Sequence, residues 1–255
     1  MARSITGFRK YMPRSLFAHA PGGIQAMSDQ TRGRLVGSTG LIGPRRDGGA
    51  VGRPDIHLVA VARREVPLPK GARMEMLLSD PEHWPDAIAA GRPHTVVIAL
   101  GTTIKAVGGD RQAFRAVDHD LVMAAAVAAK EAGARQLIVV SSVGARFSSR
   151  NFYLSVKGEV EDRLAKLHFD RLDMIRPGLL RGHREGPPRA GERIGMILSP
   201  LLDLLLVGKL RKYRSARDSD VARAILALAG AKQRGRFVHE HDELRRILGR
   251  DVGRG

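Results

Sequence analysis

The chain has 255 residues, 43% of them hydrophobic, and carries a formal net charge of +17 at neutral pH. This length and apolar content predict a domain with a full hydrophobic core and exclude a largely disordered chain. Cysteine is absent, which excludes disulfides and thiolate metal sites and favours a reducing compartment, so we expect a cytoplasmic protein.

The positive charge is compatible with nucleic-acid binding, because clustered lysine and arginine release counterions from phosphate backbones. In this chain, however, arginine is scattered over the whole length and aromatic residues make up only 4%. Zinc-finger spacings and the aromatic strand motifs of RNA-binding domains are missing. We therefore expect no specific nucleic-acid partner.

Residues 1–26 differ in composition from the rest, with four basic residues and no acidic one. Three interpretations stay open: a basic transit-like leader, a disordered tail, or a misassigned start that makes Met27 the first residue. Residues 27–255 are expected to form a single domain. Within it, we expect a substrate-side segment at about 179–218.

From Met27 onward, apolar β-branched runs alternate with helical spacing. The expected strands are Arg34–Val36, Ile56–Ala62, Thr95–Leu100, Gln136–Val140, Leu172–Ile175 and a short one at Arg236–His239. The expected helices are Gln112–Ala132, Lys157–Leu167 and Ser219–Ala229. Strands separated by helices predict an α/β fold, a Rossmann-type doubly wound parallel sheet with a small C-terminal substrate lobe.

A glycine turn follows the first expected strand. Its residues are Gly37, Ser38, Thr39, Gly40, Leu41, Ile42 and Gly43. Small residues there let the backbone approach a pyrophosphate, and a following helix offers free amides and a positive dipole end. A tight turn without a ligand is the alternative. The next residues, Pro44 to Ala50, contain two glycines and no apolar stripe, so this helix should be weak or absent and pyrophosphate binding correspondingly weaker.

The second expected strand is followed by Arg63 and Arg64. An acidic group near this position suits the ribose hydroxyls of NAD, whereas arginine suits the 2′-phosphate of NADP. Glu65 comes one residue later, so the pattern favours NADP(H) over NAD(H). The alternative interpretation is that the two arginines belong to a solvated loop.

Two later strands end in small polar residues. Leu100, Gly101 and Thr102 would border the cofactor, because ligands of doubly wound sheets lie outside the carboxyl ends of strands. A plain turn is the alternative there. The strand Gln136–Val140 ends in Ser141 and Ser142.

Tyr153 and Lys157 follow with i, i+4 spacing, which places both side chains on one helix face. A phenol is a poor base at neutral pH, but an adjacent ammonium favours its phenolate form. A serine hydroxyl can hold the substrate oxygen beside them. The order of these residues therefore indicates acid–base chemistry at a cofactor.

With these motifs the chain resembles the short-chain dehydrogenase/reductase superfamily in its atypical or extended form. The motifs most similar to its Tat-interacting-protein branch are Leu100-Gly101-Thr102-Thr103, Val117-Asp118, Ser141-Ser142, Tyr153 to Glu161, Phe169-Asp170-Arg171 and Arg176-Pro177-Gly178. The likeness spans about 35–248. It implies a Rossmann-type fold that binds NADPH, with Tyr153 as proton donor or acceptor. It further implies that Lys157 holds the nicotinamide ribose and favours the phenolate, with Ser141 as the third member and Ser142 as the other candidate.

We therefore expect an NADP-dependent oxidoreductase that acts on a small-molecule carbonyl or alcohol. Two alternatives stay open. One is a regulatory or scaffold protein that binds NADPH with little turnover. The other is an enzyme of the nucleotide-sugar epimerase or dehydratase type, for which the C-terminal lobe is short.

The apolar segment 194–207 contains Asp203 and is shorter than the roughly 20 residues that a membrane-spanning helix needs. We expect a buried or interface helix, with at most peripheral membrane contact. A homodimer is one open interpretation, and a wall of the substrate pocket is another. His239 and His241 lack a third ligand at suitable spacing, so no metal site is expected.

Overall fold

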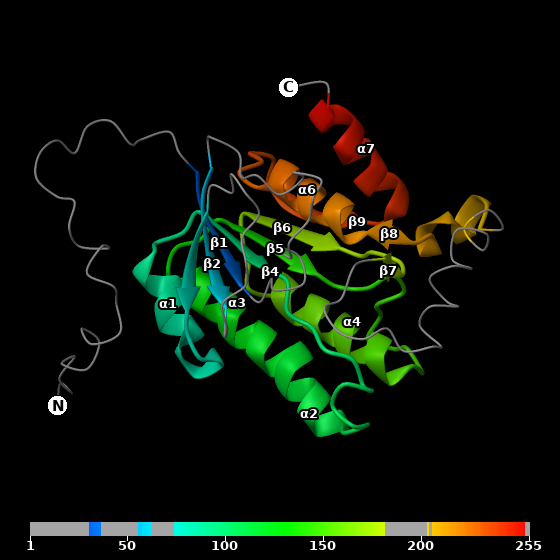
Figure 1. The fold of residues 1–255 in the computed structure, drawn as a ribbon, viewed down its shortest axis with the longest axis horizontal. Coiled ribbons are helices and arrows are strands. Elements are labelled where there is room, and N and C mark those ends of the chain that lie inside the picture. The colour runs from blue at the N-terminus through cyan, green and yellow to red at the C-terminus, as the bar shows by residue number, and fades with distance from the viewer. Residues whose placement is uncertain (1–30, 37–55, 63–73, 182–202, 204–205, 253–255) are drawn as a thin grey trace, which may run out of the picture. The chain divides into compact units, whose positions relative to one another are not determined.

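The structure is a computed structural model that describes residues 31–36, 56–62, 74–181, 203 and 206–252 (Figure 1). The chain divides into two units, Met1–Gln30 and Thr31–Gly255, and the described residues all belong to the second. The expected leader, the glycine turn at 37–43, the segment 44–50 and both Arg63 and Arg64 lie outside the described residues.

Seven strands form one sheet in which every hydrogen-bonded pair of neighbours is parallel. Their order is β3-β2-β1-β4-β5-β6-β9. The strands are β1 Thr31–Val36, β2 Ile56–Ala62, β3 Met74–Leu78, β4 Thr95–Ile98, β5 Gln136–Val140, β6 Arg171–Ile175 and β9 Gly235–His239. The chain builds the sheet outward from β1 to β3 and then returns to start β4 on the other side of β1. This reversal makes the carboxyl ends of β1 and β4 the switch point of a Rossmann-type fold, which confirms the predicted fold class.

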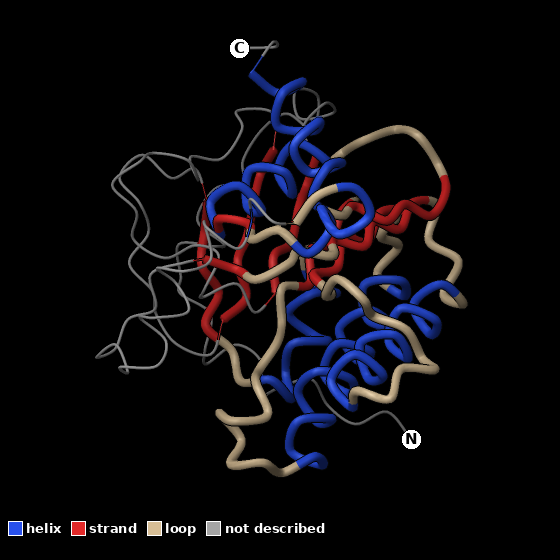
Figure 2. Tube along the Cα trace, turned by 90° about the vertical axis from the view of Figure 1, so that its right-hand side faces the viewer, coloured by secondary structure: helices blue, strands red, loops and turns tan. Residues whose placement is uncertain are grey.

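Helices cover both faces of the sheet (Figures 1 and 2). The helices on one face are α1 Trp84–Ala90, α2 Arg111–Arg115, α3 Val122–Glu131 and α4 Phe152–Ala165, with a short 3-10 turn at Pro81–His83 before α1. The helices on the other face are α6 Asp218–Leu228 and α7 His241–Val252. Because both faces are covered, the central strands are mostly apolar, and β4 is buried at all four positions.

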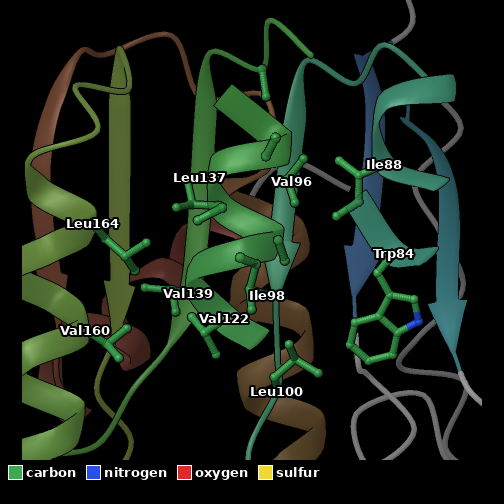
Figure 3. Packing of buried hydrophobic residues seen from close by; sticks show 14 of the residues in the cluster. Trp84, Ile88, Val96, Ile98, Leu100, Val122, Leu137, Val139, Val160 and Leu164 are labelled. Atoms are coloured by element: carbon green, nitrogen blue, oxygen red, sulfur yellow. The ribbon is translucent and has the colours of Figure 1, made fainter. Parts of the chain in front are cut away.

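Alternate residues of the central strands pack into two separate hydrophobic cores. In β4, Val96 and Ile98 join the core under α1, α3 and α4, whereas Val97 faces α6 and α7. Figure 3 shows the first core, where Val160 and Leu164 of α4 point toward β5. This period-two pattern fixes the strand register, since a slip of one residue would exchange the two cores.

The expected helix Gln112–Ala132 is not uniform. Asp110 caps α2 by accepting hydrogen bonds from the amides of Gln112 (2.7 Å) and Ala113 (3.1 Å). A wider π-helical turn at Ala116–Leu121 then separates α2 from α3. Turns of this kind insert an extra residue and are frequent at functional sites.

A buried polar network joins the strands on the α6 side. Asp173 accepts two hydrogen bonds from Arg171 (both 2.7 Å), one from Gln136 (2.8 Å) and one from His239 Nε2 (2.8 Å). Burial opposes ionisation of Asp173, but the bonds from His239, Arg171 and Gln136 outweigh it and lower the pKa of Asp173. Gln136 also donates to the carbonyl of Leu228, so the network ties β5, β6, β9 and α6 together.

The segment at about 179–218, which is expected on the substrate side, is described in part. It contains the short strand pair β7 Leu180–Arg181 and β8 Ala216–Arg217, with a 3-10 turn, η5, at Gly208–Tyr213. Asp203 accepts a hydrogen bond from the amide of Ser215 (2.9 Å) and another from its hydroxyl. Asp203 therefore has a local structural function within this segment. Among the described helices, none is long and apolar enough to cross a bilayer.

Candidate functional site

The predicted site residues that the structure describes lie at the carboxyl edge of the sheet, next to the switch point. Gly101 and Thr102 follow β4, and Ser141 and Ser142 follow β5. The side chain of Leu100 packs instead in the core beneath α3 and α4. Because β4 is the strand beside β1, this edge is where a Rossmann-type sheet binds its ligands.

Helix α4 carries the pair of Tyr153 and Lys157. It begins five residues before the predicted start at Lys157, because Asn151 caps it by accepting a hydrogen bond from the amide of Leu154 (3.1 Å). Further along, Gly158 brings the helix against the loop after β5. A Cβ at Gly158 would lie 2.2 Å from the carbonyl carbon of Arg146, so only glycine fits there.

Tyr153 lies half-buried on the first turn of α4. Its ring packs against Phe114 of α2, with ring centroids 5.7 Å apart. The ammonium of Lys157 lies 6.0 Å from the centroid of the Tyr153 ring. The phenol is therefore held by an aromatic neighbour on one side and has a cation one helical turn away.

Lys157 is buried, and its Nζ lies 2.8 Å from Oδ1 of Asp118 in the π-helical turn. The side chain of Asp118 is fully buried, with no exposed area. Its other oxygen accepts a 2.7 Å hydrogen bond from the amide of Thr102. Asp118 therefore joins the loop after β4 to the helix that carries Tyr153 and Lys157.

Asp118 was not among the predicted site residues, although the sequence contains a signal for it. It lies four residues after Phe114 and four before Val122, both of which are buried on the same helical run. A carboxylate in an apolar stripe indicates a buried charge, and a buried charge requires a partner. The partner, Lys157, is far along the chain, so helix periodicity alone could not identify it.

Ser141 and Ser142 differ in their environment. Ser141 is buried, and its hydroxyl has no hydrogen-bond partner among the described residues. Its amide donates to the carbonyl of Ile175, which holds the end of β5 against β6. Ser142 is half-buried, and its hydroxyl makes only a long 3.4 Å contact to the carbonyl of Val143. A buried hydroxyl without a partner is the better of the two for binding a ligand oxygen.

A second group of charges surrounds the outer side of the π-helical turn. Arg115 donates two hydrogen bonds to Glu159 (2.9 and 3.2 Å), and Arg163 lies 2.9 Å from the same carboxylate. The hydrogen bonds from Arg115 are the main cause that lowers the pKa of Glu159, and burial opposes them. Glu159 is thus fully engaged in fixing α4 to α2.

One turn beyond Lys157, Glu161 forms a two-bond ion pair with Arg176 at the end of β6. The hydrogen bonds that Arg176 donates to Glu161 raise the pKa of Arg176 above its usual value. Two residues later, a Cβ at Gly178 would lie 2.3 Å from the carbonyl oxygen of Arg214. The end of β6 therefore contacts α4 on one side and the backbone at Arg214 on the other.

Curated relatives identify the family of the chain. It is 36% identical over 171 residues to "Protein FMP52, mitochondrial" of Eremothecium gossypii, an alignment that covers 66% of this chain and 75% of that protein. The chain belongs to the FMP52 family. The FMP52 protein of Neurospora crassa is 32% identical over 239 residues, which cover 88% of this chain and 97% of that protein. No protein-family model matches the chain.

These FMP52 relatives also correct one prediction. Their names place them in mitochondria, so the expectation of a cytoplasmic protein is wrong. That expectation depended on the absence of cysteine, which excludes certain bonds and says little about which compartment contains the chain.

Solved structures with a similar fold are dehydrogenases, reductases and epimerases. A short-chain type dehydrogenase/reductase from Mycobacterium ulcerans has a TM-score of 0.59 at 18% identity, covering 86% of this chain and 90% of that one. A dTDP-4-dehydrorhamnose reductase from Bacillus anthracis, solved with NADP, has a TM-score of 0.55 at 13% identity, with coverage of 88% and 82%. A UDP-glucose 4-epimerase from Thermus thermophilus, solved with NAD, has a TM-score of 0.55 at 17% identity, with coverage of 86% and 81%. At these identities the likeness establishes the NAD(P)-binding type of fold.

Proposed function

We propose that the chain is an NADP(H)-dependent oxidoreductase that interconverts a small-molecule carbonyl and its alcohol. The observation that carries the proposal is the joint position of Tyr153, Lys157 and Ser141 on elements that meet at the carboxyl edge of the sheet, with a Ser141 hydroxyl that has no partner among the described residues. The resemblance to the atypical short-chain dehydrogenases, in their Tat-interacting-protein branch, supports the same roles.

The described residues fit a nicotinamide cofactor. Gly101 is exposed at the end of β4, beside the switch point, and Ser141 offers a hydroxyl that is buried and unpartnered among the described residues. Gly101 and Thr102 would border the cofactor, and Lys157 would hold its ribose. Bound there, the cofactor supplies or accepts the hydride.

The chain's own side chains carry out the proton transfer. In the direction of reduction, Tyr153 donates its phenolic proton to the substrate oxygen while hydride adds to the carbonyl carbon, and the product is an alcohol. Ser141 donates a hydrogen bond to the same oxygen and orients it. The positive charge of Lys157 stabilises the phenolate that remains, which then takes a proton from solvent.

The preference for NADP(H) depends on Arg63 and Arg64, which lie outside the described residues. Similar folds occur in complexes with NADP and with NAD, so the fold itself leaves the preference open. A fluorescence titration with NADPH and, separately, NADH measures it. We expect tighter binding of NADPH, and replacing both arginines by serine should remove the difference.

The replacement Tyr153→Phe tests the reaction. We expect loss of turnover by roughly 100-fold or more, because general acid catalysis contributes at least that much. Turnover is followed as NADPH consumption with a panel of aldehydes, ketones and quinones, and NADPH binding should remain close to that of the unmodified chain. An unchanged rate in Tyr153→Phe would instead support the alternative, a regulatory protein that binds NADPH.

A further inference from the structure

Tyr213, the last residue of η5, combines a closely packed backbone with a side chain that is 43% exposed. A Cβ at Gly178, three residues after the end of β6, would lie 2.7 Å from the carbonyl oxygen of Tyr213 and 2.3 Å from that of Arg214. Two residues beyond Tyr213, the amide of Ser215 donates a 2.9 Å hydrogen bond to Asp203. The backbone therefore holds Tyr213 in place, while much of its ring is free to contact a ligand.

The ring of Tyr213 lies beside the loop after β5, the loop that begins with Ser141. At Gly144 in this loop, φ is +80°, and a Cβ built there would lie 3.9 Å from the hydroxyl oxygen of Tyr213 and 4.0 Å from its Cε1. The same position lies 3.5 Å from Cδ1 of Leu154, the residue after Tyr153. Tyr213 is thus a neighbour of two elements that carry the proposed site, the loop after β5 and the first turn of α4.

The cations next to Tyr213 in the chain have partners elsewhere. Arg211 lies 3.0 Å from Asp242 of α7, and Arg214 donates a 2.8 Å hydrogen bond to the carbonyl of Leu206. Neither guanidinium is therefore available to bind an anionic group beside the Tyr213 ring. This arrangement favours an uncharged ligand group at Tyr213 over a carboxylate or a phosphate.

The closest neighbours of the Tyr213 ring are suited to an aromatic group. The ammonium of Lys212 lies 5.3 Å from the ring centroid, which leaves the edge and the opposite face of the ring. Leu154 on the far side of Gly144 is half-buried, and Leu179, directly after Gly178, is exposed. Aromatic rings pack well in offset or edge-to-face contacts with one another, and aliphatic side chains around them add apolar area.

We propose that Tyr213 is a specificity-determining residue, which selects carbonyl compounds that carry an aromatic group by packing its ring against that group. The inference rests on the proposed function, in which Tyr153 and Ser141 act on the substrate oxygen. It adds η5 to the site. The task of η5 is to recognise the body of the substrate, whereas α4 and the loop after β5 act on its carbonyl.

Turnover of two aldehydes tests the selection, because benzaldehyde carries an aromatic ring and acetaldehyde does not. We expect Tyr213→Ala to lower kcat/KM for benzaldehyde roughly 10-fold, through KM, since the lost ring contact contributes binding. For acetaldehyde, kcat/KM should stay within about two-fold of the unmodified chain. Tyr213→Phe keeps the ring and should retain the preference. An equal loss for both aldehydes would show a merely structural role and overturns the proposal.

Phe147 provides the matched control. It is an exposed aromatic residue of the same loop after β5, but it lines a groove between α3 and α4 together with Met123 and Lys166. Phe147→Ala should leave the ratio of the two kcat/KM values unchanged. If it lowers the ratio as much as Tyr213→Ala does, the selection does not belong to Tyr213.

Binding without turnover is measured by NMR on the full chain with ¹³C-labelled tyrosine rings, with and without NADP⁺. The sequence contains three tyrosines, so Tyr213→Phe assigns the Tyr213 signals. We expect these signals to shift with acetophenone and not with acetone, because a bound aromatic ring changes the field at its neighbour. This titration uses the unmodified chain, so it decides the question even if Tyr213→Ala does not fold. Tyr213 signals that stay unmoved up to the solubility limit of acetophenone overturn the proposal.

The two measurements separate this inference from the proposed function. If acetophenone shifts the Tyr213 signals while Tyr153→Phe turns over as fast as the unmodified chain, the acid–base function fails and recognition by Tyr213 stands. If Tyr153→Phe abolishes turnover but Tyr213→Ala leaves the preference for benzaldehyde intact, the function stands and this inference fails. If neither aldehyde is turned over, the NMR titration alone decides.

Discussion

At the scale of single residues, two glycines in helices have opposite surroundings. A Cβ at Gly158 would lie 2.2 Å from the carbonyl carbon of Arg146 and 2.3 Å from the amide nitrogen of Phe147. Backbone atoms cannot rotate out of the way, so α4 or the loop would have to move. At Gly249 in α7, no atom lies within 4 Å of such a Cβ.

We expect Gly158→Ala to lower the free energy of unfolding by about 3 kcal/mol, the upper part of the range for overpacked sites. Gly249→Ala is the matched control. It should raise the free energy of unfolding by up to about 1 kcal/mol, because alanine is the better helix former. Urea denaturation of both variants measures the difference, and a Gly158→Ala variant as stable as the unmodified chain would contradict the close approach.

The sequence allowed the positions of the catalytic candidates to be predicted better than their partners. Tyr153 and Lys157 were paired from their i, i+4 spacing, and α4 does carry both. The partner of Lys157 was not predicted, because Asp118 is distant in sequence and meets it only through the packing of two helices. Pairs of this kind depend on the tertiary structure.

At the scale of elements, the first turn of α4 depends on its cap. Asn151 accepts a hydrogen bond from the amide of Leu154, and Tyr153 lies within this turn. We expect Asn151→Ala to lower the free energy of unfolding by about 1 kcal/mol and to speed hydrogen exchange of the first-turn amides. Asn151→Asp keeps an acceptor at the cap and should remain close to the unmodified chain. Equal losses in both variants would show that the cap is unimportant.

Elements with strong local patterns were predicted well. The strand Ile56–Ala62 was predicted to the residue, because six of its seven residues are apolar and leave little choice. Helix α1 was missed, since it is short and has Pro81 just before it and Pro85 inside its first turn. Helix α7 was missed although Leu244, Ile247 and Leu248 have helical spacing and are buried together.

At the scale of the whole molecule, the network around Asp173 makes stability depend on pH. The folded-state pKa of Asp173 is lowered, so its carboxylate contributes stability that is complete above the unfolded value of about 3.9. The contribution is lost as the pH falls through the lower folded-state pKa. We therefore expect the urea midpoint to fall as the pH drops below about 3.9.

Asp173→Asn should flatten this pH dependence and lower the free energy of unfolding by about 3 kcal/mol or more at neutral pH, because Arg171 stays buried without its charged partner. Asp170→Asn is the matched control, since Asp170 is much more exposed. Its Oδ2 lies 3.6 Å from Nη2 of Arg234, which is also exposed. Its effect should be within about 1 kcal/mol. If the urea midpoint of Asp173→Asn falls with acid as it does in the unmodified chain, other carboxylates cause the pH dependence.

The fold class was the most predictable property of the whole molecule, because the alternation of strands and helices along the chain determines a parallel sheet covered on both faces. The compartment was predicted wrongly, because amino-acid composition does not determine where a protein is localised. The candidate site was predicted at the strand ends, because doubly wound parallel sheets bind their ligands outside the carboxyl ends of the strands.

The π-helical turn at Ala116–Leu121 also determines how far α3 is rotated about the helix axis relative to α2. Each residue rotates an α-helix by about 100°, so one extra residue turns everything after it by that amount. Phe114 before the turn can thus face Tyr153 while Val122 after it faces the core. Substitutions within the turn would change local chemistry, but a deletion would rotate the whole of α3 away from its core. We expect related chains to keep the spacing from Phe114 to Val122 constant.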